Sequence, residues 1–373
     1  MRIGITCYPT YGGSGAVATE LGLELAKRGH EIHVISYASP FRLPGFAENV
    51  YFHGVDVSAT YPLLEYFPYS LALAVKQHEV ALREKLDILH VHYAVPHATA
   101  AFLAREMIAA ERPLKLITTL HGTDITLVGK EKSFFTVTKF AIERSDAVTA
   151  VSNYLRHETY KAFGCNECAI KMIPNFIDLN TYHPLEERPH AFGPPGTKVI
   201  VHTSNFRPLK QVPDVVRVFQ RVREEIPAVL VLVGDGPDRP ETESVVEQFG
   251  LQEHVRFLGQ LKVVVDILQA ADLFLLPSTS ESFGLGALEA MACGVPVVSS
   301  NVGGLPEVVV HGESGMLHDP DDLDGMAASA VALLGDDQRW RAAREAAVTR
   351  AAVFSSDRIV PQYEALYREV VEG

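Results

Sequence analysis

The sequence predicts an α/β protein built from two doubly wound domains in tandem. Short β-rich runs alternate with helical patterns along most of the chain. A polar, proline-rich segment at residues 175–197 separates two such series and is typical of a linker. The chain has 373 residues, and a domain commonly takes about 150. Strands that alternate with helices form a parallel sheet covered on both faces, so we expect two such sheets.

The first half contains five strand patterns and four helix patterns. Each strand pattern is a short run rich in valine, isoleucine, leucine or threonine, and each helix pattern repeats apolar residues every three or four positions. Gly29 follows the first helix as a stop signal. The predicted strands are 2–8, 31–37, 87–93, 114–122 and 146–152, and the predicted helices are 14–30, 69–86, 94–111 and 132–145.

The second half repeats this scheme. Its predicted strands are 196–205, 228–234, 254–259, 272–278 and 295–300, and its predicted helices are 211–226, 239–251, 263–271 and 283–294. We expect a first domain at 1–170 and a second at 171–355, with a last helix at about 356–373 that packs back on the first domain. Because ligands of such sheets bind at the carboxyl ends of the strands, we expect a ligand site that both halves face.

Composition excludes several classes of protein. The formal charge of −13 argues against a nucleic-acid binder and against a basic surface that holds anionic lipid. No run of about 18 apolar residues is present, and the start of the chain lacks the features of a signal peptide. Cys165 and Cys168 form a lone C-x-x-C without the second pair that a zinc site needs. We therefore expect free thiols in a reducing cytoplasm.

The turn after the first strand is rich in glycine. Gly12, Gly13 and Gly15 allow the backbone to approach a ligand, and the helix that follows offers free amides. The spacing departs from the G-x-G-x-x-G pattern, and Ser36 and Tyr37 end the second strand where an acidic residue would be needed. A dinucleotide site is therefore disfavoured. A tight turn without a ligand remains an alternative.

Histidines gather near two strand ends in the first half. His90, His92 and His97 lie in one run, and His121 ends a later strand before a glycine. A metal site is one interpretation, but no carboxylate or cysteine joins the run at ligand spacing. Neutral, hydrogen-bonded histidines on one strand face are the favoured alternative for His90 and His92. His121 stands where active-site groups concentrate.

A basic loop follows the first strand of the second half. Arg207 and Lys210 lie three apart just before a helix, which suits a diphosphate, although a solvated basic loop is an alternative. Gly234 and Gly236 end the next strand. They suit a backbone that packs against a base or phosphate, and they equally suit a plain turn.

Two glutamates flank the start of the helix at 283–294. Glu281 lies just outside it, with Ser282 as the expected N-cap, and Glu289 lies one and a half turns inside. At about 1.5 Å of rise per residue the carboxylates should be on the order of 10 Å apart, which is too far for a glycosidase pair. The spacing suits two carboxylates that each bind a different part of a nucleotide sugar, with its phosphates at the helix amides between them. Two solvated glutamates are the alternative.

These motifs resemble a known family. The run "ESFGLGALE" looks like the Glu-x7-Glu signature of retaining nucleotide-sugar glycosyltransferases of the GT-B fold. The run "SNFRPLK" resembles their diphosphate motif, and "HGTD" resembles their histidine region. The runs "GITCYPTYGGSGAVATELG", "ISYASPFRL", "HVHYAVPHA" and "IPNFIDL" look closest to the N-acetylglucosaminyl L-malate synthases of bacillithiol biosynthesis. The resemblance covers nearly the whole chain.

The resemblance implies a reaction and a set of residues for it. The donor would be UDP-N-acetylglucosamine (UDP-GlcNAc), and the acceptor would be the hydroxyl of L-malate. The product would keep the α configuration, and the reaction would need no divalent metal. The first domain would bind the acceptor and the second the nucleotide sugar. The implied catalytic residues are His121, Arg207, Lys210 and Glu281. The implied donor-binding residues are Gly13, Ser14, Asn205, Gly234, Leu261, Ser282, Phe283, Gly284, Leu285 and Glu289.

Malate carries two carboxylates, so its pocket needs cations and amides. Arg144 is the first candidate, and we expect its replacement by alanine to raise the KM for malate. The other candidates are Ser14, Tyr93, Thr119 and Asn153. Alternatives for the whole protein are a transferase with another small acceptor such as a sugar or polyol phosphate, a UDP-sugar epimerase, and a non-catalytic nucleotide-binding module. We expect small-molecule substrates only and no stable membrane association. The sequence leaves a homo-oligomer open.

Overall fold

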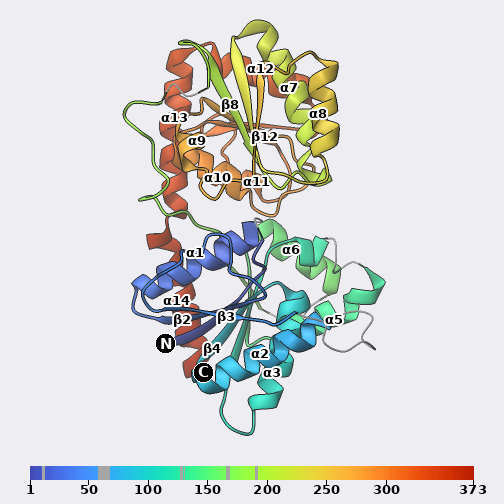
Figure 1. Cartoon of the computed structure of the whole chain (residues 1–373), viewed down its shortest axis with the longest axis vertical. Coiled ribbons are helices and arrows are strands. Elements are labelled where there is room, and N and C mark those ends of the chain that lie inside the picture. Colours follow the sequence, from blue (N-terminus) through green and yellow to red (C-terminus); the bar gives the residue numbers. More distant parts are fainter. Residues whose placement is uncertain (11–12, 58–67, 127–128, 130, 165–168, 190–191) are drawn as a thin grey trace. The chain divides into compact units, whose positions relative to one another are not determined.

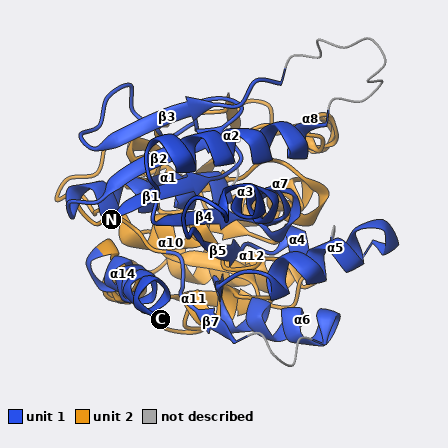
Figure 2. Ribbon diagram, turned by 90° about the horizontal axis from the view of Figure 1, so that it is seen from below, with its two compact units in different colours: residues 1–175, 357–373 blue, residues 176–356 orange. Residues whose placement is uncertain are grey.

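The computed structural model describes residues 1–373 except 11–12, 58–67, 127–128, 130, 165–168 and 190–191. The chain forms two compact units (Figures 1 and 2). Unit 1 consists of Met1–Asn175 and Asp357–Gly373, and unit 2 consists of Phe176–Ser356. The segment at 176–197 belongs to unit 2, where Phe176, Ile177 and Tyr182 are buried. It is therefore packed against that unit over part of its length.

Unit 1 contains a parallel sheet of seven strands in the order β3-β2-β1-β4-β5-β6-β7. The strands are β1 Arg2–Thr6, β2 Glu31–Ser36, β3 Val50–Gly54, β4 Ile88–His92, β5 Lys115–Leu120, β6 Ala147–Ala150 and β7 Ile170–Met172. The central strands β1, β4 and β5 are almost wholly buried, as expected for strands covered on both faces. The helices are α1 Gly13–Lys27, α2 Tyr69–Arg83, α3 Thr99–Ile108, α4 Thr123–Thr126, α5 Lys132–Glu143, α6 Asn153–Phe163 and α14 Ser356–Glu372.

The last helix of the chain packs on unit 1. Arg28 forms an ion pair with Asp357 at 3.2 Å, and His30 Nε2 lies 3.0 Å from Glu364 Oε1. Deeper inside, the Tyr367 hydroxyl lies 2.7 Å from His90 Nδ1 on β4. Tyr367 is completely buried, so α14 forms part of the core of this unit although it is distant from it in sequence.

Unit 2 contains a parallel sheet of six strands in the order β10-β9-β8-β11-β12-β13. The strands are β8 Lys198–Thr203, β9 Ala228–Val233, β10 Val255–Gly259, β11 Leu273–Leu276, β12 Val297–Ser300 and β13 Gly315–His318. The helices are α7 Val212–Glu225, α8 Arg239–Gln248, α9 Val265–Gln269, α10 Leu285–Ala292, α11 Leu305–Val308, α12 Leu323–Leu334 and α13 Asp337–Ala351. Valines of α7 and the inward residues of β8, β9 and β11 form one core. No helix among the described residues combines the length and apolar character that crossing a bilayer requires.

Several predicted boundaries are corrected by the structure. The helix expected at 94–111 begins at Thr99 and follows an irregular turn at Ala94–Ala98. The helix expected at 263–271 is only α9, Val265–Gln269. Ser282 is not the N-cap of α10, because the helix starts at Leu285 and its N-cap is Gly284 with φ +98°. A left-handed N-cap of this kind is strained for any residue with a Cβ, which explains a glycine there.

Candidate active site

In unit 1, the predicted site residues lie along one edge of the sheet. Ser14 follows β1, Tyr93 follows β4, His121 follows β5, and Asn153 follows β6. These four strands are neighbours in the order β1-β4-β5-β6. Because all of them are parallel, their carboxyl ends meet at the same edge, where ligands of such sheets bind.

Tyr93 and His121 contact each other at this edge. Their ring centroids are 5.4 Å apart, and Tyr8 after β1 lies 5.5 Å from Tyr93. Tyr93 has φ +94°, a conformation that residues other than glycine rarely adopt, and its amide donates to the Thr119 carbonyl at 2.9 Å. A strained backbone held in this way is common at binding sites.

A chain of neutral histidines supports His121. His92 Nδ1 lies 2.8 Å from His121 Nε2, and His97 Nδ1 lies 2.5 Å from the His92 carbonyl. Burial and the neighbouring His97 lower the pKa of His121 to about 3, and burial lowers that of His90 to about 3. Both are therefore neutral at pH 7. His90 is bonded to Tyr367 and to Thr119, which confirms the interpretation of a hydrogen-bonded core histidine for that residue.

Asp124 is a residue that the sequence reasoning missed. Its carboxylate accepts hydrogen bonds from the amides of Gly122 at 3.0 Å and Ala94 at 3.1 Å, with a longer one from His121 at 3.3 Å. It therefore joins the loop after β5 to the loop after β4. Burial raises its pKa to about 6. The "HGTD" run contained the signal, because an aspartate shortly after a strand end can cap backbone amides.

The structure contradicts two predicted acceptor residues. Thr119 is fully buried, and its hydroxyl already bonds His90 Nε2 and the Thr149 hydroxyl, both at 2.7 Å. Arg144 is the C-cap of α5 and comes before β6, so it lies at the edge where strands begin, opposite to His121. Its guanidinium lies over the ring of Phe140, 5.5 Å from the centroid.

The remaining unit 1 candidates differ in exposure. Gly13 is exposed at the start of α1, and Ser14 next to it is buried. Asn153 is half-buried and is the first residue of α6, whose N-cap Ser152 accepts a hydrogen bond from the Leu155 amide. Gly15 has a structural reason of its own, because a Cβ there would lie 2.6 Å from the Tyr8 carbonyl oxygen. Gly12, Cys165 and Cys168 lie outside the described residues.

In unit 2, the predicted donor residues also follow neighbouring strands. The order β10-β9-β8-β11 places four loops at one edge of the sheet. Leu261 follows β10, Gly234 follows β9, and Glu281 follows β11. The loop after β8 carries the polar and basic candidates, which are Asn205, Arg207 and Lys210.

Lys210 and Glu281 form an ion pair although 71 residues separate them. Glu281 Oε1 also accepts from the Ser278 hydroxyl at 3.0 Å. The two loops are joined by backbone as well, since the Thr279 amide donates to the Leu209 carbonyl at 2.9 Å. Arg207, by contrast, is exposed. The loop after β8 thus offers Lys210, a cation paired with a buried carboxylate, and Arg207, an exposed cation.

Glycines allow these loops to touch. A Cβ on Gly234 would lie 1.8 Å from the Ser204 carbonyl oxygen, and one on Gly236 would lie 2.2 Å from that of Asn205. A Cβ on Gly303 would lie 1.8 Å from the Glu281 carbonyl oxygen. The loops after β8, β9, β11 and β12 are therefore in backbone contact, which fixes where Asn205 and Glu281 stand.

Helix α10 supplies the rest of the predicted donor site. Ser282 is half-buried, while Phe283 is buried and packs edge-on against Phe354 at 5.6 Å, so only its backbone can serve a ligand. Gly284 and Leu285 begin the helix. Glu289 has only 4% of its surface exposed, which excludes the interpretation of a solvated glutamate.

Comparison with known proteins places this geometry in a family. Residues 186–350 match the model for glycosyl transferases group 1, and residues 11–181 match that for glycosyltransferase family 4. The chain is 48% identical to the N-acetyl-alpha-D-glucosaminyl L-malate synthase of Bacillus anthracis, over 100% of this chain and 97% of that protein. It is 28% identical to the D-inositol 3-phosphate glycosyltransferase of Mycolicibacterium smegmatis, over 92% and 83% of the two chains.

Solved structures show the same fold. Sucrose-phosphate synthase from Thermosynechococcus elongatus superposes with a TM-score of 0.83 at 21% identity, over 99% of both chains. Anabaena HepE in complex with UDP and glucose superposes with a TM-score of 0.78 at 20% identity, over 99% and 100% of the chains. The expected GT-B fold is therefore confirmed. With two glycosyltransferase domain matches and near-half identity over its full length, the chain is a glycosyltransferase and belongs to the family of N-acetyl-alpha-D-glucosaminyl L-malate synthases.

Proposed function

We propose that this enzyme transfers N-acetylglucosamine from UDP-GlcNAc to the hydroxyl of L-malate, the first step of bacillithiol biosynthesis. The observation that carries the proposal is the 48% identity over the whole chain to a synthase named for that product. The strand-end residues of both units support it, because each unit presents polar groups on consecutive strands of its sheet. The anomeric configuration of the sugar is retained in this proposal.

Unit 2 binds the nucleotide sugar in this proposal. HepE, which shares the fold, was solved with UDP and glucose and with UDP-glucose. Arg207 and Lys210 hold the diphosphate, and the amides of Gly284 and Leu285 at the start of α10 assist them. Glu289 accepts the ribose hydroxyls and Glu281 those of the sugar. Asn205, Ser282 and the backbone at Phe283 complete the donor site, with Gly234 and Leu261 bordering the base.

The reaction needs a stabilised leaving group. The bond between the sugar C1 and the β-phosphate oxygen breaks, and the malate hydroxyl oxygen bonds to C1 on the same face. The hydroxyl proton passes to the departing phosphate oxygen. Arg207 and Lys210 stabilise the charge that develops on UDP, and such electrostatic stabilisation is usually a large part of catalysis. These cations take the place that a divalent metal has in other transferases, so chelation should leave the rate unchanged.

Unit 1 binds the acceptor. Ser14 and the first amides of α1 suit one malate carboxylate, and Asn153 at the start of α6 suits the other. Tyr93 and the neutral His121 follow β4 and β5, the strands between β1 and β6, and we assign His121 a catalytic role near the reacting carbon. Arg144 and Thr119 are not part of this proposal, for the reasons of position and burial given above.

The decisive experiment is UDP release from UDP-GlcNAc with and without L-malate, followed by NMR of the anomeric proton of the product. Malate-dependent release with an α-anomeric product is the expected result. Release that depends on a sugar phosphate or polyol phosphate instead would replace malate by another acceptor. Conversion of the donor without any acceptor would indicate an epimerase, and binding of UDP without turnover would indicate a binding module.

A cytoplasmic location is part of the proposal, because both substrates are cytoplasmic metabolites.

A further inference from the structure

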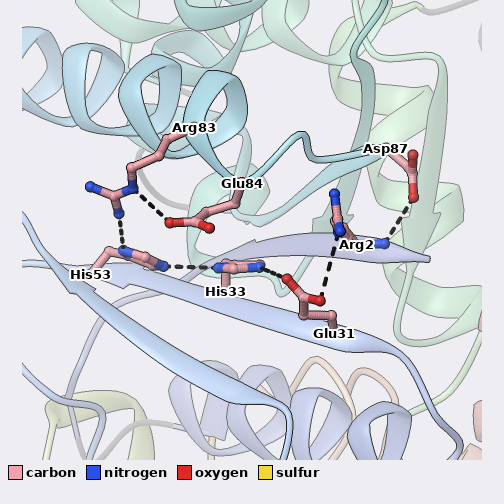
Figure 3. A network of polar contacts seen from close by, with 7 residues as sticks. All are labelled: Arg2, Glu31, His33, His53, Arg83, Glu84 and Asp87. Atoms are coloured by element: carbon pink, nitrogen blue, oxygen red, sulfur yellow. Dashed lines mark hydrogen bonds and ion pairs between the residues drawn. The ribbon is translucent and has the colours of Figure 1, made fainter.

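A cluster of metal-ligating side chains lies on unit 1, on β2, β3 and the end of α2 (Figure 3). It consists of His33 on β2, His53 on β3 and Glu84, the C-cap of α2. One possible ligand atom from each lies within 4.8 Å of the others. It is the one group of three or more such residues found at this spacing within the described part of the chain.

The cluster is separate from the proposed active site. Glu84 lies between the end of α2 and the start of β4, where Asp87 bonds the amide of Arg2 at 2.8 Å. This is the edge at which the strands begin, whereas Tyr93 and His121 follow the ends of β4 and β5. The following inference therefore does not depend on the proposed function.

His33 has the environment of a metal ligand. Its Nδ1 faces His53 Nε2 at 2.9 Å, and its Nε2 lies 3.0 Å from Glu31 Oε1. A ligating histidine usually donates its second ring N–H to a carboxylate, which orients the ring and raises its basicity. Glu31 provides that carboxylate. His33 is buried, so its ring is held in place.

At present a hydrogen-bond chain satisfies the cluster. A guanidinium can only donate, so Arg83 donates to His53 Nδ1 at 3.2 Å. His53 Nε2–H then donates to His33 Nδ1, and His33 Nε2–H donates to Glu31. Arg83 also bonds Glu84 at 2.6 Å and is 63% exposed.

We propose that His33, His53 and Glu84 form a binding site for a divalent zinc ion, with a water molecule as the fourth ligand. Two imidazoles and one carboxylate are a set that zinc accepts in tetrahedral geometry. Binding replaces the His33–His53 hydrogen bond by two metal bonds. His53 moves its proton to Nδ1, and Arg83 swings into solvent and releases Glu84. The ion joins the edge strand β3 to β2 and to the end of α2, so it should stabilise this part of unit 1.

The test is zinc titration of the full chain at pH 7.5 by calorimetry, with thermal unfolding followed in parallel. The wild type should bind one more equivalent of zinc than His53→Gln and His33→Ala, and magnesium should not bind there. Zinc should raise the unfolding midpoint of the wild type and leave that of His53→Gln unchanged. His78→Ala, which removes a histidine of α2 outside the cluster, should behave as the wild type. Equal zinc stoichiometry and affinity in the wild type and His53→Gln would overturn the proposal.

Arg83 offers a second and opposite prediction. Its guanidinium competes with the metal for Glu84 and His53 and repels a cation, so Arg83→Ala should tighten zinc binding, by about tenfold for a single charge nearby in a water-like medium. Glu31→Gln should weaken it by about 10- to 100-fold, the usual cost of losing such a supporting group. Circular dichroism of each metal-free variant verifies folding. Weaker zinc binding by Arg83→Ala would contradict the assignment of these ligands.

Discussion

Lys210 and Arg207 have the same proposed role but different surroundings. Lys210 is paired with Glu281, whose side chain is only 9% exposed, whereas Arg207 is exposed. Removing a partner from a largely buried charge costs more than removing an exposed side chain, because the charge that remains is poorly solvated. The two residues therefore allow catalysis and stability to be measured separately.

We expect Lys210→Ala and Arg207→Ala each to lower kcat by about 10²- to 10³-fold, the usual effect of deleting a group that stabilises developing negative charge. Lys210→Ala should also lower the free energy of unfolding by about 1–3 kcal/mol, because Glu281 loses its cation. Arg207→Ala should leave it within about 0.5 kcal/mol. UDP release and urea unfolding measure the two effects. Arg217→Ala, which removes a half-buried α7 residue paired with Asp214, is the control. A normal kcat in Arg207→Ala would contradict the diphosphate assignment.

Asp124 supports a second prediction at this scale. Asp124→Asn keeps one acceptor oxygen and replaces the other by an amide, so it cannot serve both Gly122 and Ala94. The free energy of unfolding should fall by about 1–3 kcal/mol, the cost of an unpaired buried group. The loop that carries His121 should loosen as well, and kcat should fall. Chemical denaturation and malate-dependent kinetics test this. Unchanged stability would mean that these bonds add nothing to the fold.

At the residue level, the sequence predicted which chemical groups stand at the strand ends but not their partners. Lys210 and Glu281 were both chosen as site residues, yet nothing along the chain shows that they contact each other. Arg144 was misplaced because its position before β6 was not compared with the direction of the strand. Thr119 was chosen for its place at the end of β5, and nothing along the chain shows that its hydroxyl is bonded to His90 and Thr149.

At the scale of elements, the active edge of unit 2 depends on loops that pack without side chains. Gly303 after β12 has φ +59°. A Cβ added to it would lie 1.8 Å from the Glu281 carbonyl oxygen. Gly312, in the turn before β13, has φ +80° and nothing within 4 Å of such a Cβ. The two glycines share a left-handed backbone and differ in their neighbours.

Gly303→Ala should therefore cost clearly more than Gly312→Ala. Both variants carry the strain of a left-handed alanine, about 1–2 kcal/mol. Only Gly303→Ala also has to separate the loops after β11 and β12, so its total loss should exceed that of Gly312→Ala by several kcal/mol and its UDP affinity should fall. Urea denaturation and UDP titration give both quantities. Equal losses in the two variants would show that the loops separate at no cost.

The elements that the sequence predicted well are long or central. The buried strands β9 and β11 are continuous apolar runs, and β1, β4 and β8 are short runs with mostly buried residues, as expected for strands covered on both faces. The strands missed are β3, β7 and β13, and all three are sheet edges or end pieces of three to five residues. An edge strand buries little, so its composition differs little from that of a loop. The N-cap of α10 was misplaced because Ser282 is a common cap and Gly284 an uncommon one.

At the scale of the whole molecule, the two units contain unequal numbers of wholly or partly buried histidines whose pKa values are lowered. Unit 1 contains His53, His90, His97 and His121, whose pKa values burial lowers to about 4, 3, 4 and 3. Unit 2 contains His202, whose pKa burial lowers to about 4. In the unfolded chain each would titrate near 6.5. Between these values the unfolded state binds more protons than the folded state, so stability falls as the pH falls.

We therefore expect acid to unfold unit 1 before unit 2. The histidine contribution is fully present above pH 6.5 and is lost as the pH falls toward 3–4, at about 1.4 kcal/mol per pH unit for each proton. Asp124 acts in the opposite sense, because its raised pKa favours the folded state as the pH falls from about 6 to 4, but it offsets only one histidine.

Calorimetry of the full chain between pH 7 and 5 should show the unit 1 midpoint falling faster, with the unit 2 transition identified by its response to UDP. His90→Gln keeps hydrogen-bonding groups for Tyr367 and Thr119 and should reduce the pH slope of unit 1 by about one proton. Midpoints that shift in parallel for both units would contradict the neutral state of these histidines in the folded protein.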